Sequence, residues 1–267
     1  MLISHEAPKN YIYQIQKFND YDYFLIHLYE KYDEYKEFYN FCQKNNRMII
    51  LDNSACELRG KEEYDFDKYA NMIEKLKPTE YLIPDVFNDY EKNMEYFEKW
   101  MKNYKDLPGK KIVTLHGKDI IDLINAYIEF DHFDVKIAIN FDECIYTKYD
   151  ICSGNISMNK MFNRINFINM LIYYGIINES KEHHLLGCHL PQEFKSYKYF
   201  DWISSIDTSN PVMCGLTDDF PYTTSGTLSK PKLNIDNSQD IEYDEQKMKI
   251  IEENIKIFRS FCERKII

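Results

Sequence analysis

The chain of 267 residues lacks several features that would place a protein in a class at once. No stretch approaches roughly 18 uninterrupted apolar residues, so the sequence predicts no transmembrane helix and no membrane partner. The first residues, MLISHEAPKNYIY, hold no basic segment followed by an apolar run, which argues against secretion and favours a cytoplasmic location. Glycine and proline number only eight each, and no Gly/Pro-rich linker occurs. We therefore expect a single domain over residues 1–267.

Cysteine pairs and an excess of positive charge are missing as well. The seven cysteines are scattered without a CxxC pair, which is typical of free thiols in a reducing compartment and disfavours a structural zinc site. The net charge of −11 excludes a broad basic surface that binds nucleic acid without specificity. It leaves room for a nucleic-acid enzyme with a local basic rim. The 44% hydrophobic content, by contrast, is enough for a full core.

What the sequence does contain is an alternation of short apolar runs and longer amphipathic segments. Runs of five or six residues rich in Ile, Val and Leu are typical of strands buried on both faces of a parallel sheet. Eight such βα units in this length predict a (β/α)8 barrel. The alternative is an open doubly wound sheet, which would normally show a Gly-rich turn after its first strand, and the sequence has no such turn there. We predict strands at 24–28, 48–52, 81–85, 111–115, 135–140, 184–188 and 202–207, a weaker eighth strand at 232–235, helices at 30–45, 64–76, 89–104, 119–130, 157–174 and 241–263, and a mobile loop at 217–231.

Polar residues gather where the predicted strands end. An Asp directly after a strand is more often a turn or helix cap than a catalyst. Asp52, Asp85 and Asp207 would nevertheless all face one mouth of a barrel, where their mutual repulsion would be costly without a use. Two carboxylates across a pocket can break a glycosidic bond, one attacking the anomeric carbon and the other moving the proton of the leaving group. The sequence offers no GxSxG elbow, HExxH, P-loop or GxGxxG as an alternative.

Five motifs in order give the chain a resemblance to a known family. They are LDNSACE (51–57), IPDVFND (83–89), TLHG (114–117), HLLGCHLP (184–191) and SSIDTSNP (204–211). This set resembles the tRNA-guanine transglycosylase superfamily, and it is most similar to the small phage members that put 7-deazaguanines into DNA. The resemblance implies a (β/α)8 barrel, DNA and a free 7-deazaguanine base as partners, and a host cytoplasm as the location. It implies exchange of guanine without metal, nicotinamide or ATP, so we expect no cofactor.

The resemblance also assigns roles to individual residues. Asp207 corresponds to the nucleophile that bonds to C1′, and Asp52 to the general acid and base that moves the proton of the base. Asp85 corresponds to the carboxylate that accepts hydrogen bonds from N1–H and N2–H₂ of guanine, a pair of donors that adenine does not offer. The remaining expected substrate contacts are Asn53, Ser54, Phe87, His116, Gly117, Gly187, Cys188 and His189.

Several positions depart from the family pattern. The C-terminal zinc-binding CxCxxC…H of the tRNA enzymes is absent, which weakens the case for tRNA as the substrate. Asn53 and Ser54 replace Ser-Gly, and His116 replaces a glutamine, so the identity of the incoming base stays open. Phe87 could stack on the base but is more simply a core residue, and His116 could contact a base carbonyl or act as a structural donor. No Cys or Asp stands at ligand spacing from His183, His184 and His189, which disfavours a metal site.

A DNA substrate requires local positive charge around the mouth. Lys195 and Lys198 follow the HLLGCHLP turn, and Lys230 and Lys232 follow the predicted loop beyond Asp207. We expect these four lysines to contact phosphates, joined by Lys160 and Arg164. Each of them alone is equally well explained as part of a solvated surface, and an accessory DNA-binding partner remains an option.

Three other functions compete with DNA base exchange. The same chemistry could act on tRNA, or the barrel could bind a nucleobase or nucleotide without catalysis, with Asp85 retained. An ordinary glycoside hydrolase is a weaker alternative, because the strand ends at LDNSACE and SSIDTS match nucleobase exchange better than sugar binding.

Overall fold

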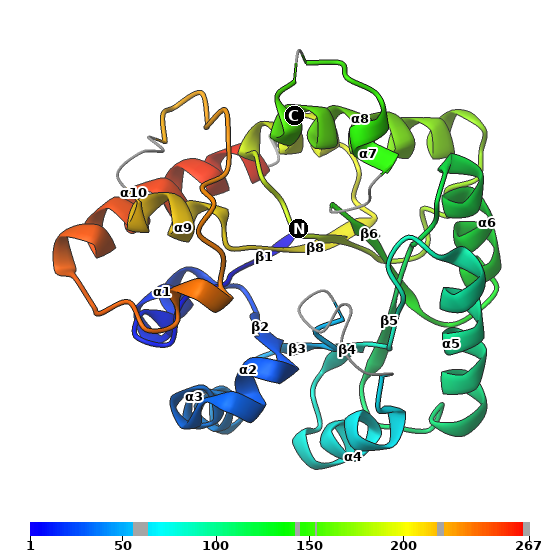
Figure 1. Cartoon of the computed structure of the whole chain (residues 1–267), viewed down its shortest axis with the longest axis horizontal. Helices are drawn as coiled ribbons and strands as arrows, with labels where there is room; N and C mark the ends of the chain where they lie inside the picture. Colours follow the sequence, from blue (N-terminus) through cyan, green and yellow to red (C-terminus); the bar gives the residue numbers. More distant parts are fainter. Residues whose placement is uncertain (56–63, 142–144, 153, 218–221, 264–267) are drawn as a thin grey trace.

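The computed structural model describes residues 1–55, 64–141, 145–152, 154–217 and 222–263. Eight parallel strands form the inner wall of a nearly closed barrel, and helices lie between consecutive strands on the outside (Figure 1). The strands are β1 (Leu2–His5), β2 (Asp22–Leu25), β3 (Ile49–Asp52), β4 (Glu80–Leu82), β5 (Lys110–Thr114), β6 (Lys136–Asn140), β7 (His183–Leu186) and β8 (Ile203–Thr208). The chain therefore folds as the (β/α)8 barrel that the alternation predicts.

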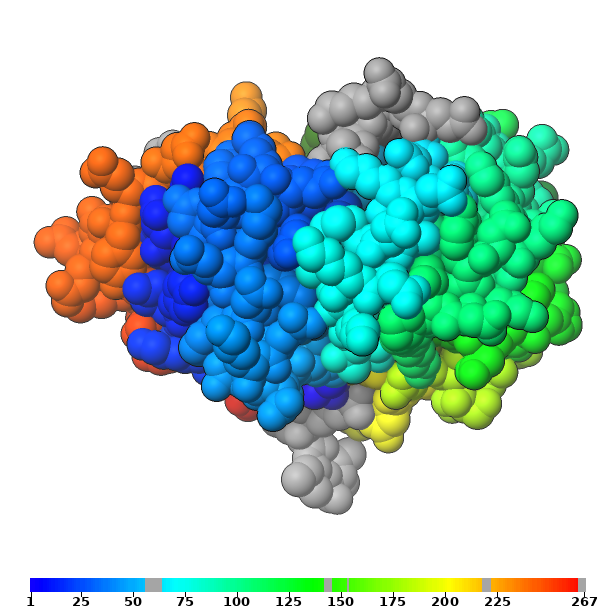
Figure 2. All heavy atoms as spheres, turned by 90° about the horizontal axis from the view of Figure 1, so that it is seen from below, coloured from blue at the N-terminus to red at the C-terminus, as the bar shows by residue number. Residues whose placement is uncertain are grey.

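The helices cover the barrel in sequence order. Seen from below, the outer wall runs from the blue residues of the first units through cyan to green, so consecutive units are neighbours (Figure 2). No helix among the described residues is long and apolar enough to cross a membrane. The helices are α1 (Ile12–Ile15), α2 (Ile26–Lys31), α3 (Asp33–Lys44), α4 (Phe66–Leu76), α5 (Tyr90–Asn103), α6 (Ile120–Asp131), α7 (Ile145–Lys148), α8 (Ile156–Tyr173), α9 (Asn210–Leu216) and α10 (Glu245–Cys262), with short 3-10 turns η1 (Gln16–Phe18), η2 (Pro191–Tyr197) and η3 (Asp236–Ser238).

Local sequence explains why the long helices form where they do. The side chain of Asp89 caps α5 by accepting a hydrogen bond from the Lys92 amide (3.2 Å), and Asp119 caps α6 in the same way. The apolar face of α5 then buries Phe97 and Trp100 against the barrel. The six predicted helices agree with α3, α4, α5, α6, α8 and α10 to within a few residues.

The eighth strand lies elsewhere than predicted. The segment 232–235 is not a strand but an irregular stretch that ends at η3, and Ile235 is buried as part of the cavity wall. The barrel is completed by β1, which pairs in parallel with β8, so that Ser4 stands opposite Asp207. The predicted strand at 24–28 is also displaced, because β2 begins at Asp22 and the chain turns into α2 after Leu25.

A seam without ladder pairing separates β1 from β2 in the order β1-β8-β7-β6-β5-β4-β3-β2. Side-chain bonds span it, together with a backbone bond from the Asp20 amide to the Ile3 carbonyl (2.9 Å). The amide of Ile3 donates to Asp20 Oδ2 (2.9 Å), and the amide of His5 donates to Asn19 Oδ1 (2.8 Å). The amide of Tyr23 donates to Ser4 Oγ (3.1 Å). These bonds satisfy the polar groups of both strands, as their burial requires.

The segment 217–231, expected to be a mobile loop, is described except for residues 218–221. Two side chains hold it from neighbouring elements. Gln192 Nε2 donates to the carbonyl of Thr227 (2.6 Å), and Asn155 Nδ2 donates to the carbonyl of Leu228 (2.9 Å). These contacts place the segment beside η2 and the start of α8, at the mouth of the barrel. Its predicted mobility stays a prediction.

Candidate active site

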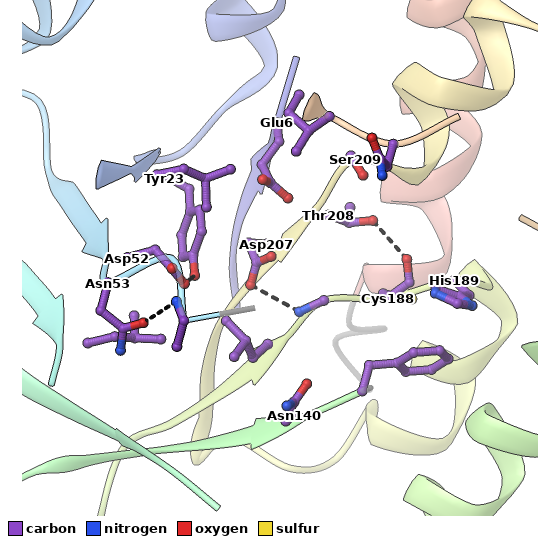
Figure 3. Close-up of a pocket in the computed structure, with 18 of the residues that line it drawn as sticks. Glu6, Tyr23, Asp52, Asn53, Asn140, Cys188, His189, Asp207, Thr208 and Ser209 are labelled. Atoms are coloured by element: carbon purple, nitrogen blue, oxygen red, sulfur yellow. Dashed lines mark hydrogen bonds between the residues drawn. The ribbon is translucent and has the colours of Figure 1, made fainter. Parts of the chain in front are cut away.

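The carboxyl ends of the strands surround one cavity of about 310 Å³. Asp52 and Tyr23 lie on one side of it, Cys188 and His189 on the other, and Asp207 between them (Figure 3). A volume of this size lies at the lower end of the range for small-molecule sites. The lining residues are Glu6, Tyr23, Leu25, Asp52, Asn53, Ala55, Leu82, Asp85, Phe87, Asn140, Phe141, Leu186, Gly187, Cys188, His189, Asp207, Thr208, Ser209, Lys230, Asn234, Ile235 and Asp236.

Asp207 lies near the end of β8, and one of its oxygens is firmly held. Oδ1 accepts hydrogen bonds from Nε2 of His184 (2.9 Å) and from the amide of Gly187 (3.1 Å). Gly187 has a φ of +70°, a left-handed conformation that favours glycine and turns its N–H toward the carboxylate. Asp207 is 4% exposed and lines the cavity.

Asp52 ends β3 and is held by two donors of its own. The Tyr23 hydroxyl donates to Oδ2, and the amide of Ser54 donates to Oδ1. Ser54 adopts a φ of +58° and is itself fixed by His27, whose Nδ1 lies 2.8 Å from Ser54 Oγ. His27 Nε2 in turn lies 2.6 Å from Oδ1 of Asp236, which also lines the cavity. The loop around Asp236 is thereby tied to the strand end that carries Asp52.

Asp85 follows β4, and the side chains of Asn53 and His116 hold its carboxylate in place. Asn53 Nδ2 lies 3.4 Å from its Oδ1 and also donates to the carbonyl of Ile83 (2.6 Å). His116 Nε2 lies 3.1 Å from its Oδ2. The ring of Phe87 packs against His116 with 4.5 Å between centroids and lines the cavity next to Asp85. A carboxylate beside an aromatic face is suited to the polar edge and the flat surface of a base.

A stacked pair of rings links Asp52 to Asp207. Tyr23 of β2 and His184 of β7 lie nearly parallel, 8° between planes and 6.1 Å between centroids. Burial lowers the pKa of His184 below its usual 6.5, although its hydrogen bond to Asp207 opposes this shift. Burial, followed by the charge of Asp52, raises the pKa of the Tyr23 hydroxyl well above 10. His184 is therefore neutral and Tyr23 protonated, so both act as hydrogen-bond donors to carboxylates.

Negative charge dominates the cavity. Glu6, Asp52, Asp85, Asp207 and Asp236 all line it, and Lys230 is the only lysine or arginine among the described lining residues. Hydrogen-bond donors offset the repulsion at the three strand-end aspartates, as described above. The described residues include no group of three or more His, Cys, Asp or Glu side chains arranged to hold a metal ion.

The cavity brings together most of the residues expected from the sequence. Burial raises the pKa of the Cys188 thiol, so this side chain is not an activated nucleophile. His189 contacts Phe141 with 4.4 Å between ring centroids and Ser157 Oγ at 3.2 Å. The residues predicted from the sequence that line the cavity are Asp52, Asn53, Asp85, Phe87, Gly187, Cys188, His189, Asp207 and Lys230.

Three expected substrate contacts do not line it. Ser54 and His116 are fully buried and act behind Asp52 and Asp85, so we replace direct contact with a positioning role for both. Gly117 packs on α6, where a Cβ would come within 2.3 Å of Asp122 Cβ. Its small size serves helix packing and not substrate contact.

Three of the four expected phosphate contacts also lie outside the cavity lining. The Lys195 ammonium sits over the ring of Phe261 (4.8 Å), Lys198 is half-buried after η2, and Lys232 is exposed. Arg164 cannot contact phosphates, because it is fully buried, pairs with Glu193 (2.7 Å) and donates to the carbonyl of Ile139.

Several lining residues escaped the sequence analysis. Glu6 follows β1, a strand that we did not predict, and Asp236 follows the segment mistaken for a strand. Tyr23 lies within β2, and no motif marks it. Asn140 does carry a signal, since it ends a predicted apolar strand just as Asp52 does.

Comparisons with known proteins address the fold. No protein-family model matches the sequence, and no curated protein matches it either. One solved structure that does match is D-psicose 3-epimerase, crystallised in the presence of D-fructose. The TM-score is 0.52 at 12% sequence identity, and the match covers 98% of this chain and 96% of that chain. At this identity the similarity shows the fold alone, and the chain is a (β/α)8 barrel.

Proposed function

We propose that the protein is a base-exchange transglycosylase that replaces guanine in DNA with a 7-deazaguanine through a covalent intermediate on Asp207. The observation that carries the proposal is the meeting of Asp52, Asp85 and Asp207 around one cavity. These residues are far apart in the sequence, and three separate motifs of the resemblance assign them complementary roles. A barrel that bound its ligand by shape alone would have no use for three buried carboxylates at one mouth.

The cycle begins when the target nucleotide leaves the stack, because C1′ cannot be reached inside a duplex. Asp85 accepts hydrogen bonds from N1–H and N2–H₂ of guanine, and Phe87 offers its ring to the face of the base. An adenine offers Asp85 no such pair of donors, so the remaining acceptor capacity of this buried carboxylate would stay unfilled, at a cost of about 1–3 kcal/mol.

The exchange itself uses the other two carboxylates. Asp207 attacks C1′ while the bond to guanine breaks, and Asp52 gives its proton to the departing base. The ester to C1′ keeps the strand intact. A 7-deazaguanine then takes the place of guanine, Asp52 removes its N9 proton, and N9 displaces Asp207 from C1′.

The charge of the cavity favours entry of a base and not of a phosphate. Its acidic side chains repel the phosphate backbone even while Asp52 carries a proton, so the DNA strand would stay at the rim, where Lys230 stands. With a net charge of −11, the protein leaves room for an accessory partner that holds the DNA.

The test is incorporation of labelled guanine into guanine-containing DNA or tRNA by the wild type and by Asp207→Ala. We expect the wild type to label DNA, and Asp207→Ala to label nothing while it still binds the free base. If only tRNA is labelled, the protein catalyses the same base exchange with tRNA as its substrate. If neither polymer is labelled and the two proteins bind base equally, the barrel is a nucleobase-binding protein. Mass analysis of nucleosides from DNA co-expressed with a deazaguanine supply identifies the base that is inserted.

A further inference from the structure

The two oxygens of Asp207 have different environments. Oδ1 takes the hydrogen bonds from His184 Nε2 and the Gly187 amide, whereas no hydrogen bond reaches Oδ2 from the part of the chain that the structure describes. Asp207 lines the cavity, so Oδ2 is the oxygen available to a reacting atom. Oδ2 would then form the bond to C1′, and Oδ1 would become the carbonyl oxygen of the ester.

The tautomer of His184 follows from its two neighbours. The carboxylate of Asp207 can only accept, so Nε2 of the neutral ring carries the proton and donates it across 2.9 Å. Nδ1 then accepts from the hydroxyl of Ser205, 2.9 Å away. The ring is fully buried and stacked on Tyr23, which leaves it one orientation.

Negative charge moves from one carboxylate to the other during the first half of the reaction. Before the attack, Asp207 is ionised and Asp52 carries the proton that the guanine will take. After the attack, Asp207 is a neutral ester and Asp52 is ionised. A hydrogen bond to an ionised oxygen is roughly twice as strong as one to a neutral oxygen. The donors to Asp207 therefore stabilise most strongly before the attack, and the donors to Asp52 after it.

We propose that Tyr23 and His184 stabilise this charge in turn, His184 on Asp207 before the attack on C1′ and Tyr23 on Asp52 after it. The inference rests on the proposed function. His184 is a positioning residue that fixes Oδ2 as the attacking atom, and its bond to Oδ1 favours the return of Asp207 as a leaving group. Tyr23 favours the state in which Asp52 has given up its proton. Stacking holds the two donors at a fixed separation, so neither can serve the other carboxylate.

The two donors therefore have opposite effects on one measurable quantity, the fraction of enzyme in covalent linkage with DNA. Removing the donor to Asp207 destabilises the free carboxylate more than the ester, so His184→Phe is expected to raise the ratio of adduct to free enzyme by about tenfold. Removing the donor to Asp52 destabilises the adduct state, so Tyr23→Phe is expected to lower that ratio by about tenfold. Both variants keep an aromatic ring in the stack.

The experiment incubates full-length protein with end-labelled, guanine-containing DNA at a fixed concentration of free guanine and counts adducts after denaturation. His184→Gln keeps an N–H donor and is expected to restore a ratio near that of the wild type. Tyr21→Phe is the matched control, because the Tyr21 hydroxyl is buried without a hydrogen-bond partner among the described residues. It is expected to leave the adduct ratio unchanged.

A purely structural role for the pair would lower adduct and exchange together in both variants, and that outcome overturns the inference. So does a fall in adduct for His184→Phe, or a rise for Tyr23→Phe. If the wild type exchanges guanine and both variants show the same adduct ratio as the wild type, the proposed function stands and this inference is wrong. A wild type that forms no adduct and exchanges no guanine overturns both.

Discussion

Acidification to pH 5 should destabilise the fold through its buried histidines, and His183 allows the effect to be worked out. His183 lies on β7 with Nδ1 2.9 Å from the carbonyl of Lys181 and Nε2 2.9 Å from the hydroxyl of Tyr127. The carbonyl requires a proton on Nδ1, so Nε2 accepts the Tyr127 hydrogen. That hydroxyl oxygen already accepts the amide of Asn178 (2.8 Å). A second proton on the ring would force Tyr127 to turn its own hydrogen away and lose its hydrogen bond to Nε2, and burial lowers the pKa of His183 to about 4.

The sign follows from which state binds more protons. Below a pH of about 6.5 the unfolded chain takes up a proton at this histidine and the folded protein does not. The stability is therefore complete above pH 6.5 and falls as the pH drops from 6.5 toward 4. Between pH 7 and pH 5 the loss amounts to about 2 kcal/mol for this one group. Burial lowers the pKa of His5 to about 3, so His5 contributes a similar loss over the same range.

The assay is urea denaturation at pH 7 and pH 5, followed by circular dichroism. His183→Gln removes the titrating group, so its free energy of unfolding should fall between the two pH values by about 2 kcal/mol less than that of the wild type. His132→Gln, at an exposed position, should change as the wild type does. Equal losses for His183→Gln and the wild type would refute the reasoning, whatever the stability of the variant at pH 7.

Three further outcomes are expected from single contacts. Glu193→Ala leaves the fully buried guanidinium of Arg164 without its partner and should lower the free energy of unfolding by about 3–5 kcal/mol in urea titrations; a loss below about 1 kcal/mol would contradict the buried pairing. Gly187→Ala places a Cβ at a φ of +70°, so stability should fall by about 1 kcal/mol and guanine exchange should drop as the amide leaves Asp207; unchanged exchange would speak against this contact. Lys230→Ala should reduce the slope of log affinity for DNA against log salt by about one, and an unchanged slope would remove Lys230 from the phosphate contacts.

The carboxylate positions could be predicted because each follows an apolar run. A strand buried on both faces is visible as such a run, and the parallel arrangement then brings its end to the mouth of the barrel. Asp52 and Asp207 each stand at the end of such a strand, and both line the cavity. Their mutual placement followed from topology alone, without any knowledge of side-chain contacts.

Other parts of the site could not be read from the pattern. The strand β1 has only four residues, and Leu2 is exposed, so it leaves no clear apolar run in the sequence. The segment KLNI at 232–235 is equally short, and the pattern predicts it as the eighth strand instead. In β7 both faces are buried, so the alternation of side chains did not reveal that His184 points to the site. The role of Tyr23 depends on a contact with a strand end from the next unit, and only the folded barrel brings these together.

The seam between β1 and β2 is the place where the described sheet around the cavity has no backbone ladder. Every other pair of neighbouring strands is joined by a backbone ladder, whereas here side-chain bonds of Asn19, Asp20 and Ser4 accompany one backbone bond, from the Asp20 amide to the Ile3 carbonyl. Tyr23 sits on this border, and its own amide makes one of these bonds. A wider barrel would have to break these bonds and part the Tyr23 ring from the His184 ring, so the stack opposes widening at this border. In the proposed reaction, the separation of Asp52 and Asp207 would thus be kept by side chains at this border and not by a backbone ladder.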